Sequence, residues 1–127
     1  MKPYPYFNIA LEESYHDGDV IFKEGNSGDW VYVVLSGAVE VSKAVDGARF
    51  VLSILKSGEV FGELALIGAV KRTATTRAIG RTTVGIIDKG FLDREFNKLS
   101  TDFRTVLVAM VDRFIKTMDR AREFSTV

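Results

Sequence analysis

Glycines recur at short intervals between residues 11 and 88 and divide this part of the chain into short segments. They stand at positions 18, 25, 28, 37, 47, 58, 62, 68, 80 and 85. This spacing is typical of many short strands joined by tight turns. It therefore predicts a β-rich fold for most of the chain.

The segments between these glycines are rich in β-branched and aromatic residues, as strands are. They cover residues 20–24, 29–37, 38–44, 49–55, 73–79 and 81–88. Both faces of the segment 29–37 are apolar, with Val31, Val33 and Leu35 on one side and Trp30, Tyr32 and Val34 on the other. Two apolar faces are expected where one sheet covers another. Asp-Gly pairs at 17–18 and 46–47 are hairpin signals. We predict an antiparallel β-sandwich or β-roll over about residues 11–88.

The pattern changes to a helical one after Asp88. Residues 91–100 predict a short helix, and Ser100, Thr101 or Asp102 can cap a longer one that ends near Phe124. One stripe of this longer helix comprises Phe103, Leu107, Met110, Phe114, Thr117, Ala121 and Phe124. A second set widens the apolar face: Val106, Val111, Ile115 and Met118. We expect one side to pack on the β-core and some apolar surface to remain for another chain.

The composition narrows the possible functions. A chain of 127 residues fits a single domain, and its 17 basic and 17 acidic residues argue against broad binding to nucleic acid or membranes. No apolar run approaches the ~18 residues of a membrane helix, and the first residues do not resemble a secretory signal. We expect a soluble, cytoplasmic protein. With no cysteine and one histidine, His16, we expect neither a metal site nor enzyme activity.

Two opposite charges, Glu63 and Arg72, interrupt the apolar stretch FGELALIGAVKRTAT at residues 61–75. The simplest interpretation is a surface ion pair, which contributes little to stability. However, Glu63 begins a predicted helical turn whose free N–H groups favour a bound anion, and its carboxylate can accept a hydrogen bond from a ligand hydroxyl. Arg72 offers a rigid fork for two phosphate oxygens, and Thr73 adds a hydroxyl beside it. This set predicts a ligand with a phosphate close to a hydroxyl, such as a ribose phosphate.

The same region resembles a known family. GEVFGELALIGAVKRTATTRA, residues 58–78, resembles the phosphate-binding cassette of cyclic nucleotide-binding domains, as in the catabolite activator protein and protein kinase A regulatory subunits. DGDVIFKEGNSGDWVYVVLSGAVEVSK, residues 17–43, resembles the strands that lead to it. The resemblance covers about residues 11–120. It implies an antiparallel double-stranded β-helix, a jelly-roll-like β-roll with a short cassette helix, closed by C-terminal helices at about 90–124.

The resemblance also implies roles for the cassette residues. Gly62 would offer its N–H to the cyclic phosphate, Glu63 would accept from the ribose 2′-hydroxyl, and Arg72 would pair with an exocyclic phosphate oxygen. Pocket walls would come from Leu64 and Ala65, which can also supply backbone donors. Thr73 would contact phosphate or base. Lys71 departs from the family pattern, in which proline is common at this position.

The identity of the base is indicated by two features that disagree. Threonine after the arginine, here Thr73, resembles eukaryotic cGMP-binding members. Residues 113–117 resemble the helix of bacterial cAMP-binding regulators, so that Arg113 and Thr117 would lie at the adenine end, although Met118 replaces a serine. We favour cAMP over cGMP.

The expected function is that of a ligand-sensing regulatory domain. Helix 101–124 would relay binding of the cyclic nucleotide and offers an apolar surface through which two subunits can pair as a homodimer. The output domain or partner is open, as is whether the chain is a free-standing sensor or part of a larger protein. No helix-turn-helix follows, so we expect no direct contact with nucleic acid. The alternative is a ligand-free interaction or dimerisation module with the same fold.

Overall fold

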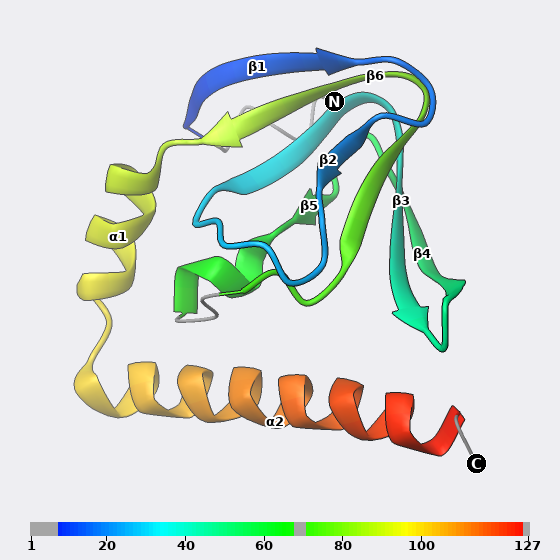
Figure 1. Cartoon of the computed structure of the whole chain (residues 1–127). Coiled ribbons are helices and arrows are strands. Elements are labelled where there is room, and N and C mark those ends of the chain that lie inside the picture. Colours follow the sequence, from blue (N-terminus) through cyan, green and yellow to red (C-terminus); the bar gives the residue numbers. More distant parts are fainter. Residues whose placement is uncertain (1–7, 68–70, 126–127) are drawn as a thin grey trace.

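The computed structural model of the chain describes residues 8–67 and 71–125, the last five of these by their backbone only. The strands are β1 (Ile9–Tyr15), β2 (Val20–Phe22), β3 (Val31–Val45), β4 (Ala48–Lys56), β5 (Val60–Phe61) and β6 (Thr75–Ile87). A short 3-10 helix, η2 (Glu63–Ile67), follows β5, and α1 (Lys89–Asn97) and α2 (Thr101–Ser125) follow β6 (Figure 1). Gly68, included in the expected cassette turn, lies outside the described residues.

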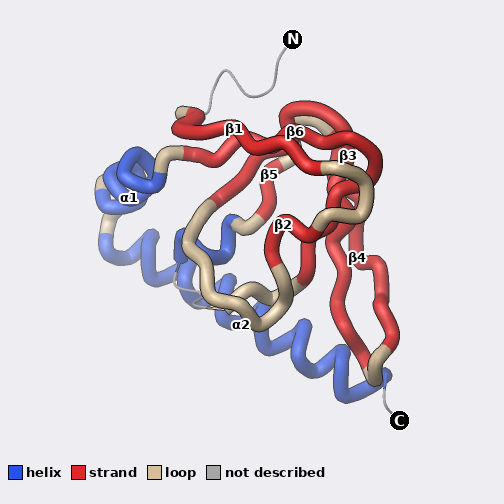
Figure 2. The backbone as a smooth tube through the Cα atoms, turned by 45° about the horizontal axis from the view of Figure 1, so that its top comes forward, coloured by secondary structure: helices blue, strands red, loops and turns tan. Residues whose placement is uncertain are grey.

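Within the described residues, six strands form one antiparallel sheet in the order β1-β6-β3-β4. β2 pairs with β6 and β5 pairs with β3, so the sheet curls into a roll, and α2 runs along one side of it (Figure 2). The predicted mainly β fold with C-terminal helices is confirmed. No helix in the described ranges is both long and apolar enough to cross a membrane.

Two predicted pairs of short strands are in fact two long strands. Segments 29–37 and 38–44 merge into β3, and 73–79 and 81–88 merge into β6. Gly37 and Gly80 have φ of +83° and +66°, a conformation that glycine adopts readily, and the β3–β6 register shifts next to Gly37. These glycines therefore bend long strands around the roll. The Asp46-Gly47 pair does form the predicted β3–β4 hairpin, with positive φ at both residues as a type I′ turn requires.

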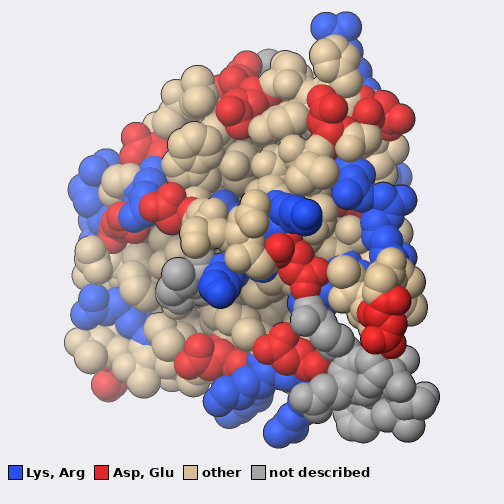
Figure 3. All heavy atoms as spheres, in the orientation of Figure 1, with Lys and Arg blue, Asp and Glu red and all other residues tan. Residues whose placement is uncertain are grey.

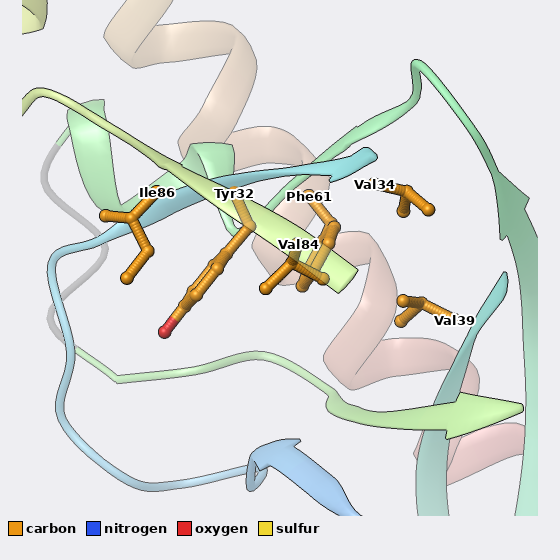
Figure 4. Packing of buried hydrophobic residues seen from close by; sticks show 6 residues of the cluster. All are labelled: Tyr32, Val34, Val39, Phe61, Val84 and Ile86. Atoms are coloured by element: carbon orange, nitrogen blue, oxygen red, sulfur yellow. The ribbon is translucent and has the colours of Figure 1, made fainter. Parts of the chain in front are cut away.

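The core lies inside the roll. Figure 4 shows a cluster of buried side chains from β3, β5 and β6, namely Tyr32, Val34, Val39, Phe61, Val84 and Ile86. Tyr32 and Phe61 stack with ring centroids 5.0 Å apart. On the other face of the sheet, Val31, Val33 and Ile87 form a second buried cluster. Of the two apolar faces predicted for 29–37, residues 31–34 are buried, whereas Leu35 is half-buried and Trp30 is 43% exposed.

The helices begin at side-chain caps. Asp88 accepts a hydrogen bond from the Phe91 N–H, and Ser100 from the Phe103 N–H, the latter at 3.1 Å. α2 turns one side toward the rest of the domain, where its least exposed apolar residues are Leu107, Val111, Ile115 and Met118. Apolar side chains remain exposed on another side: Phe103, Val106, Met110 and Phe114. The side chains of Ala121 and Phe124, which belong to the predicted stripe, lie outside the described part.

Candidate functional site

A cavity of about 300 Å³ lies between the cassette, the β3–β4 hairpin and α2. Six of the eight predicted site residues line it, namely Gly62, Glu63, Leu64, Ala65, Arg72 and Thr73. The remaining lining is mainly apolar and comes from Phe22 of β2, from Val41, Leu52 and Leu55 of the hairpin, and from Phe114 and Met118 of α2. The cavity therefore combines a few polar groups with a mainly apolar lining, which is the usual construction of a small-molecule site.

The cassette turn depends on Gly62. Its φ is +76°, and a Cβ atom there would lie 2.9 Å from Arg72 Nη1 and 3.0 Å from the Trp30 carbonyl oxygen. Only glycine allows this close approach. Glu63 follows in the first turn of η2 and is exposed, so its carboxylate is accessible beside the cavity.

Arg72 carries the positive charge into the cavity wall. It is only 7% exposed, and its guanidinium donates from Nη2 to the Trp30 carbonyl at 2.9 Å and from Nη1 to the Gly62 carbonyl at 3.3 Å. Its Cζ lies 4.1 Å from the centroid of the Phe22 ring, a cation–π distance. Among the described residues, nothing accepts a hydrogen bond from the buried Nε–H. The Nε–H is thus a buried donor without an acceptor in the described part of the chain.

Burial determines the direction of the Arg72 pKa shift. Removal from water lowers the pKa of the guanidinium, and the nearby Tyr32 and Asp29 act in the opposite direction. An arginine retains its proton at neutral pH even so. The site therefore presents a lasting positive charge at low exposure, where attraction to an anion is screened less than at the surface.

Glu63 and Arg72 are not partners within the described residues. The guanidinium bonds to two carbonyl oxygens, and no contact within 4 Å joins it to the exposed carboxylate. The interpretation as a surface ion pair is therefore wrong. Both charges remain available to a molecule in the cavity.

The backbone at Arg72 is fixed by the loop after β2. The Arg72 N–H donates to the Asn26 carbonyl and the Gly25 N–H donates to the Arg72 carbonyl, both at 2.8 Å. In the same loop, a Cβ atom on Gly28 would lie 2.9 Å from Arg72 Nε. Sequence reasoning missed Phe22, Gly28 and Trp30 as neighbours of the arginine. Of these three, Gly28 carries a signal in the sequence, but its spacing from the other glycines predicts only a turn.

Arg113 and Thr117 are not brought to the cavity. Both are exposed on α2, where Thr117 Oγ1 donates to the Arg113 carbonyl at 2.8 Å. Their neighbours Phe114 and Met118 face the cavity instead. A role for Arg113 and Thr117 in reading a base stays a prediction.

Among the described residues, the face of the molecule shown in Figure 3 carries no surface patch of a single charge. On the face shown in Figure 3, acidic and basic side chains are interspersed, in keeping with the balanced charge of the chain. No group of three or more potential metal ligands occurs in the part of the chain that is described. Attraction of an anion therefore depends on the local arrangement around Arg72.

Comparisons with known proteins agree on one family. The family model "Cyclic nucleotide-binding domain" matches residues 12–98. The chain is 30% identical over 118 residues to the cAMP-dependent protein kinase type II regulatory subunit of Drosophila melanogaster, covering 90% of this chain and 30% of that protein. It is 42% identical over 82 residues to the cAMP-dependent protein kinase regulatory subunit of Debaryomyces hansenii, covering 65% and 18%.

Solved structures lead to the same family. The cGMP-bound form of the EAL enzyme Bd1971 has a TM-score of 0.77 and 28% identity, covering 83% of this chain and 28% of that one. The regulatory domain of Toxoplasma gondii PKA with cAMP has a TM-score of 0.62 and 29% identity, covering 84% and 39%. The chain spans less than a third of the length of the two curated relatives. This chain belongs to the cyclic nucleotide-binding domain family.

Proposed function

We propose that this chain is a non-catalytic regulatory domain that binds a cyclic nucleotide monophosphate, with cAMP favoured over cGMP. The observation that carries the proposal is the convergence of Gly62, Glu63, Arg72 and Thr73 on one cavity whose remaining lining is mainly apolar. A cyclic nucleotide has the matching division, with phosphate and ribose hydroxyl at one end and a flat base at the other.

The phosphate would lie against Arg72 and the cassette turn. The Nε–H, which has no acceptor among the described residues, would donate to a phosphate oxygen. The two N–H groups that now bond to the Trp30 and Gly62 carbonyls would be shared with other phosphate oxygens. The Gly62 N–H would offer a further bond, and Leu64 and Ala65 would close the wall. Glu63, free of Arg72, would accept the hydrogen bond of the 2′-hydroxyl.

The base would lie between the hairpin and α2. Leu52 on β4 and Phe114 and Met118 on α2 provide apolar surface there, and stacking on an aromatic ring tolerates any base. Discrimination would then depend on Thr73 and on Arg113 and Thr117 if α2 turns when ligand binds. The names of several relatives, which are cAMP-dependent kinase subunits, support cAMP, while a neighbour with bound cGMP supports the broader class.

Helix α2 would relay the binding event. It contributes cavity residues and also packs against η2, so a ligand that draws η2 and Phe114 together changes the position that α2 prefers. The exposed apolar residues Phe103, Val106 and Met110 on the same helix would pair two copies of the domain.

Thermal unfolding with ligand tests the proposal directly. Saturation with cAMP at about 100 times its Kd should stabilise the domain by about 2.7 kcal/mol, with a smaller gain at equal cGMP and none with 5′-AMP. Arg72→Gln should abolish the gain. Arg81→Gln, an exposed arginine on β6 that does not line the cavity, is the matched control and should retain it.

The outcomes separate the two candidate functions. If the wild-type protein gains no stability from cAMP or cGMP, the ligand-free interaction module is the better account, and the exposed face of α2 is then the feature to pursue. If Arg72→Gln retains the full gain, the phosphate does not lie where we propose.

A further inference from the structure

A buried lysine lies directly behind the phosphate-binding wall. Lys43 on β3 is only 6% exposed, although lysine is almost never buried unless it is paired. It does not line the cavity, so the site described above does not account for it. Burial of an ammonium costs free energy that an apolar residue of similar size would not cost, which makes a purely stabilising role a poor explanation.

The contacts of Lys43 join two segments of the site. Its Nζ donates to the Thr73 carbonyl at 2.7 Å and lies 3.3 Å from Glu24 Oε2. The other carboxylate oxygen, Oε1, accepts from the Ala44 N–H at 3.0 Å. Glu24 immediately precedes Gly25 and Asn26, the two residues that hold the backbone of Arg72. Lys43 therefore ties both the loop at 24–26 and the segment 72–73 to the central strand β3.

These bonds form a frame around the arginine. Within the described residues, the Arg72 N–H and carbonyl are bonded to Asn26 and Gly25, and the Thr73 carbonyl is bonded to Lys43. The first two bonds connect one loop to another. The third bond joins the Thr73 carbonyl to Lys43, which lies on β3 in the middle of the sheet. The central strand therefore gives the frame a rigid support.

We propose that Lys43 is a positioning residue of the nucleotide site. Its ammonium, oriented by Glu24, holds the Thr73 carbonyl so that the Arg72 guanidinium and the Thr73 hydroxyl face the cavity before a ligand arrives. Charge-assisted hydrogen bonds are short and strong, which explains why a lysine occupies this buried position. The inference rests on the proposed function, because the site that Lys43 supports is the proposed anion site.

The effect should appear in ligand affinity. In Lys43→Met the segment 72–73 loses the hydrogen bond that holds it to β3. If only about a tenth of the molecules then have Arg72 and Thr73 in the position that binds ligand, the Kd for cAMP rises about tenfold. Calorimetric titration below the unfolding transition measures this Kd on folded protein. Lys43→Arg retains a charged donor and should bind several times more tightly than Lys43→Met.

A control variant separates positioning from the loss of a cation on the sheet. Arg49 on β4 is exposed, forms an ion pair with Glu40 on β3 at 3.4 Å and does not line the cavity. Arg49→Met should change the unfolding temperature little and leave the Kd within about twofold of wild type, since the frame at 72–73 stays intact. An equal rise of Kd in Arg49→Met and Lys43→Met would overturn the proposal.

Amide hydrogen exchange in the ligand-free protein tests the frame without any nucleotide. The amides of Arg72 and Gly25 should exchange at least about tenfold faster in Lys43→Met, while the β3–β4 amides keep their protection. If Lys43→Met does not fold, Lys43→Gln takes its place in both experiments. Unchanged protection at Arg72 overturns the positioning role. Faster exchange in Lys43→Met, combined with a wild-type protein that binds no cyclic nucleotide, would overturn only the proposed ligand.

Discussion

At the scale of single residues, the guanidinium of Arg72 is the group on which the site depends. It already has acceptors in the Trp30 and Gly62 carbonyls and an aromatic surface in Phe22. A phosphate would therefore exchange some bonds and add one at Nε, and the net gain is smaller than the number of contacts suggests. The advantage lies in preorganisation, because little side-chain freedom is left to lose.

Gly28 tests how closely this arginine is confined. A Cβ atom there would meet Arg72 Nε at 2.9 Å and Nη2 at 3.0 Å, so Gly28→Ala should displace the guanidinium. Loss of one charge-assisted bond to phosphate, worth about 1.5 kcal/mol, raises the Kd for cAMP about tenfold. Calorimetric titration measures it. Ser27→Ala, an exposed neighbour in the same loop, should bind like wild type, and equal affinity of Gly28→Ala would contradict the geometry.

The cassette residues could be predicted because they are close in sequence and share one task. Gly62, Glu63, Arg72 and Thr73 lie within a dozen positions, and their chemistry alone indicates an anion with a hydroxyl. Phe22, Gly28 and Lys43 could not be assigned in this way. They reach Arg72 and Thr73 from segments tens of residues away, through pairings that no local pattern specifies.

At the scale of elements, strand content was predictable and strand length was not. A glycine with positive φ serves equally in a turn or in a bulge, so spacing alone cannot show that Gly37 and Gly80 lie inside long strands. The interlocking contact at Gly37, where Thr82 Oγ1 donates to the Ala38 carbonyl at 3.0 Å, joins residues more than forty positions apart. A contact between residues so far apart in the sequence could not be predicted without the fold.

The side of α2 that packs against the domain could not be predicted from the sequence either. Both apolar sets predicted for this helix contain packed and exposed members, because the packed side falls between them. A rotation of about 100°, the angle between consecutive helical residues, decides whether residues 113 and 117 or residues 114 and 118 face the cavity, and the structure has the latter pair there. Periodicity gives the helix its apolar surface but not its orientation.

Phe114 provides a test of α2 as a wall of the site. It lines the cavity and is 50% exposed, so Phe114→Ala should cost little stability but should weaken cAMP binding by about tenfold through loss of one stacking partner. Met110, one turn earlier, is 60% exposed and does not line the cavity. Met110→Ala is therefore the control. Fluorescence or calorimetric titration of both variants distinguishes them, and similar Kd values would remove Phe114 from the site.

At the scale of the whole molecule, the outer side of α2 is the surface most suited to another chain. Phe103, Val106, Met110 and Phe114 are exposed along one helix, and contiguous apolar surface of this kind marks interaction sites. Because Phe114 belongs to both this surface and the cavity wall, pairing of two copies would couple their sites.

Sedimentation equilibrium should therefore give twice the mass of one chain, with the balance between monomer and dimer shifted by cAMP. Val106→Glu places a charge in the apolar surface and should yield monomers. Thr105→Glu, its exposed neighbour, should not. A wild-type protein that stays monomeric at all concentrations would refute homodimerisation through α2.

The pairing of β6 also has a consequence for how the chain reaches this structure. β6 is the last strand, yet it is the partner of β1, β2 and β3, and Ile9 faces Ile87 across the sheet. Loops that span most of the domain must close before these strands gain their hydrogen bonds, so folding is expected to be slow for a chain of this size. During synthesis, β1, β2 and the edge of β3 that pairs with β6 therefore stay unpaired until residue 87 has left the ribosome.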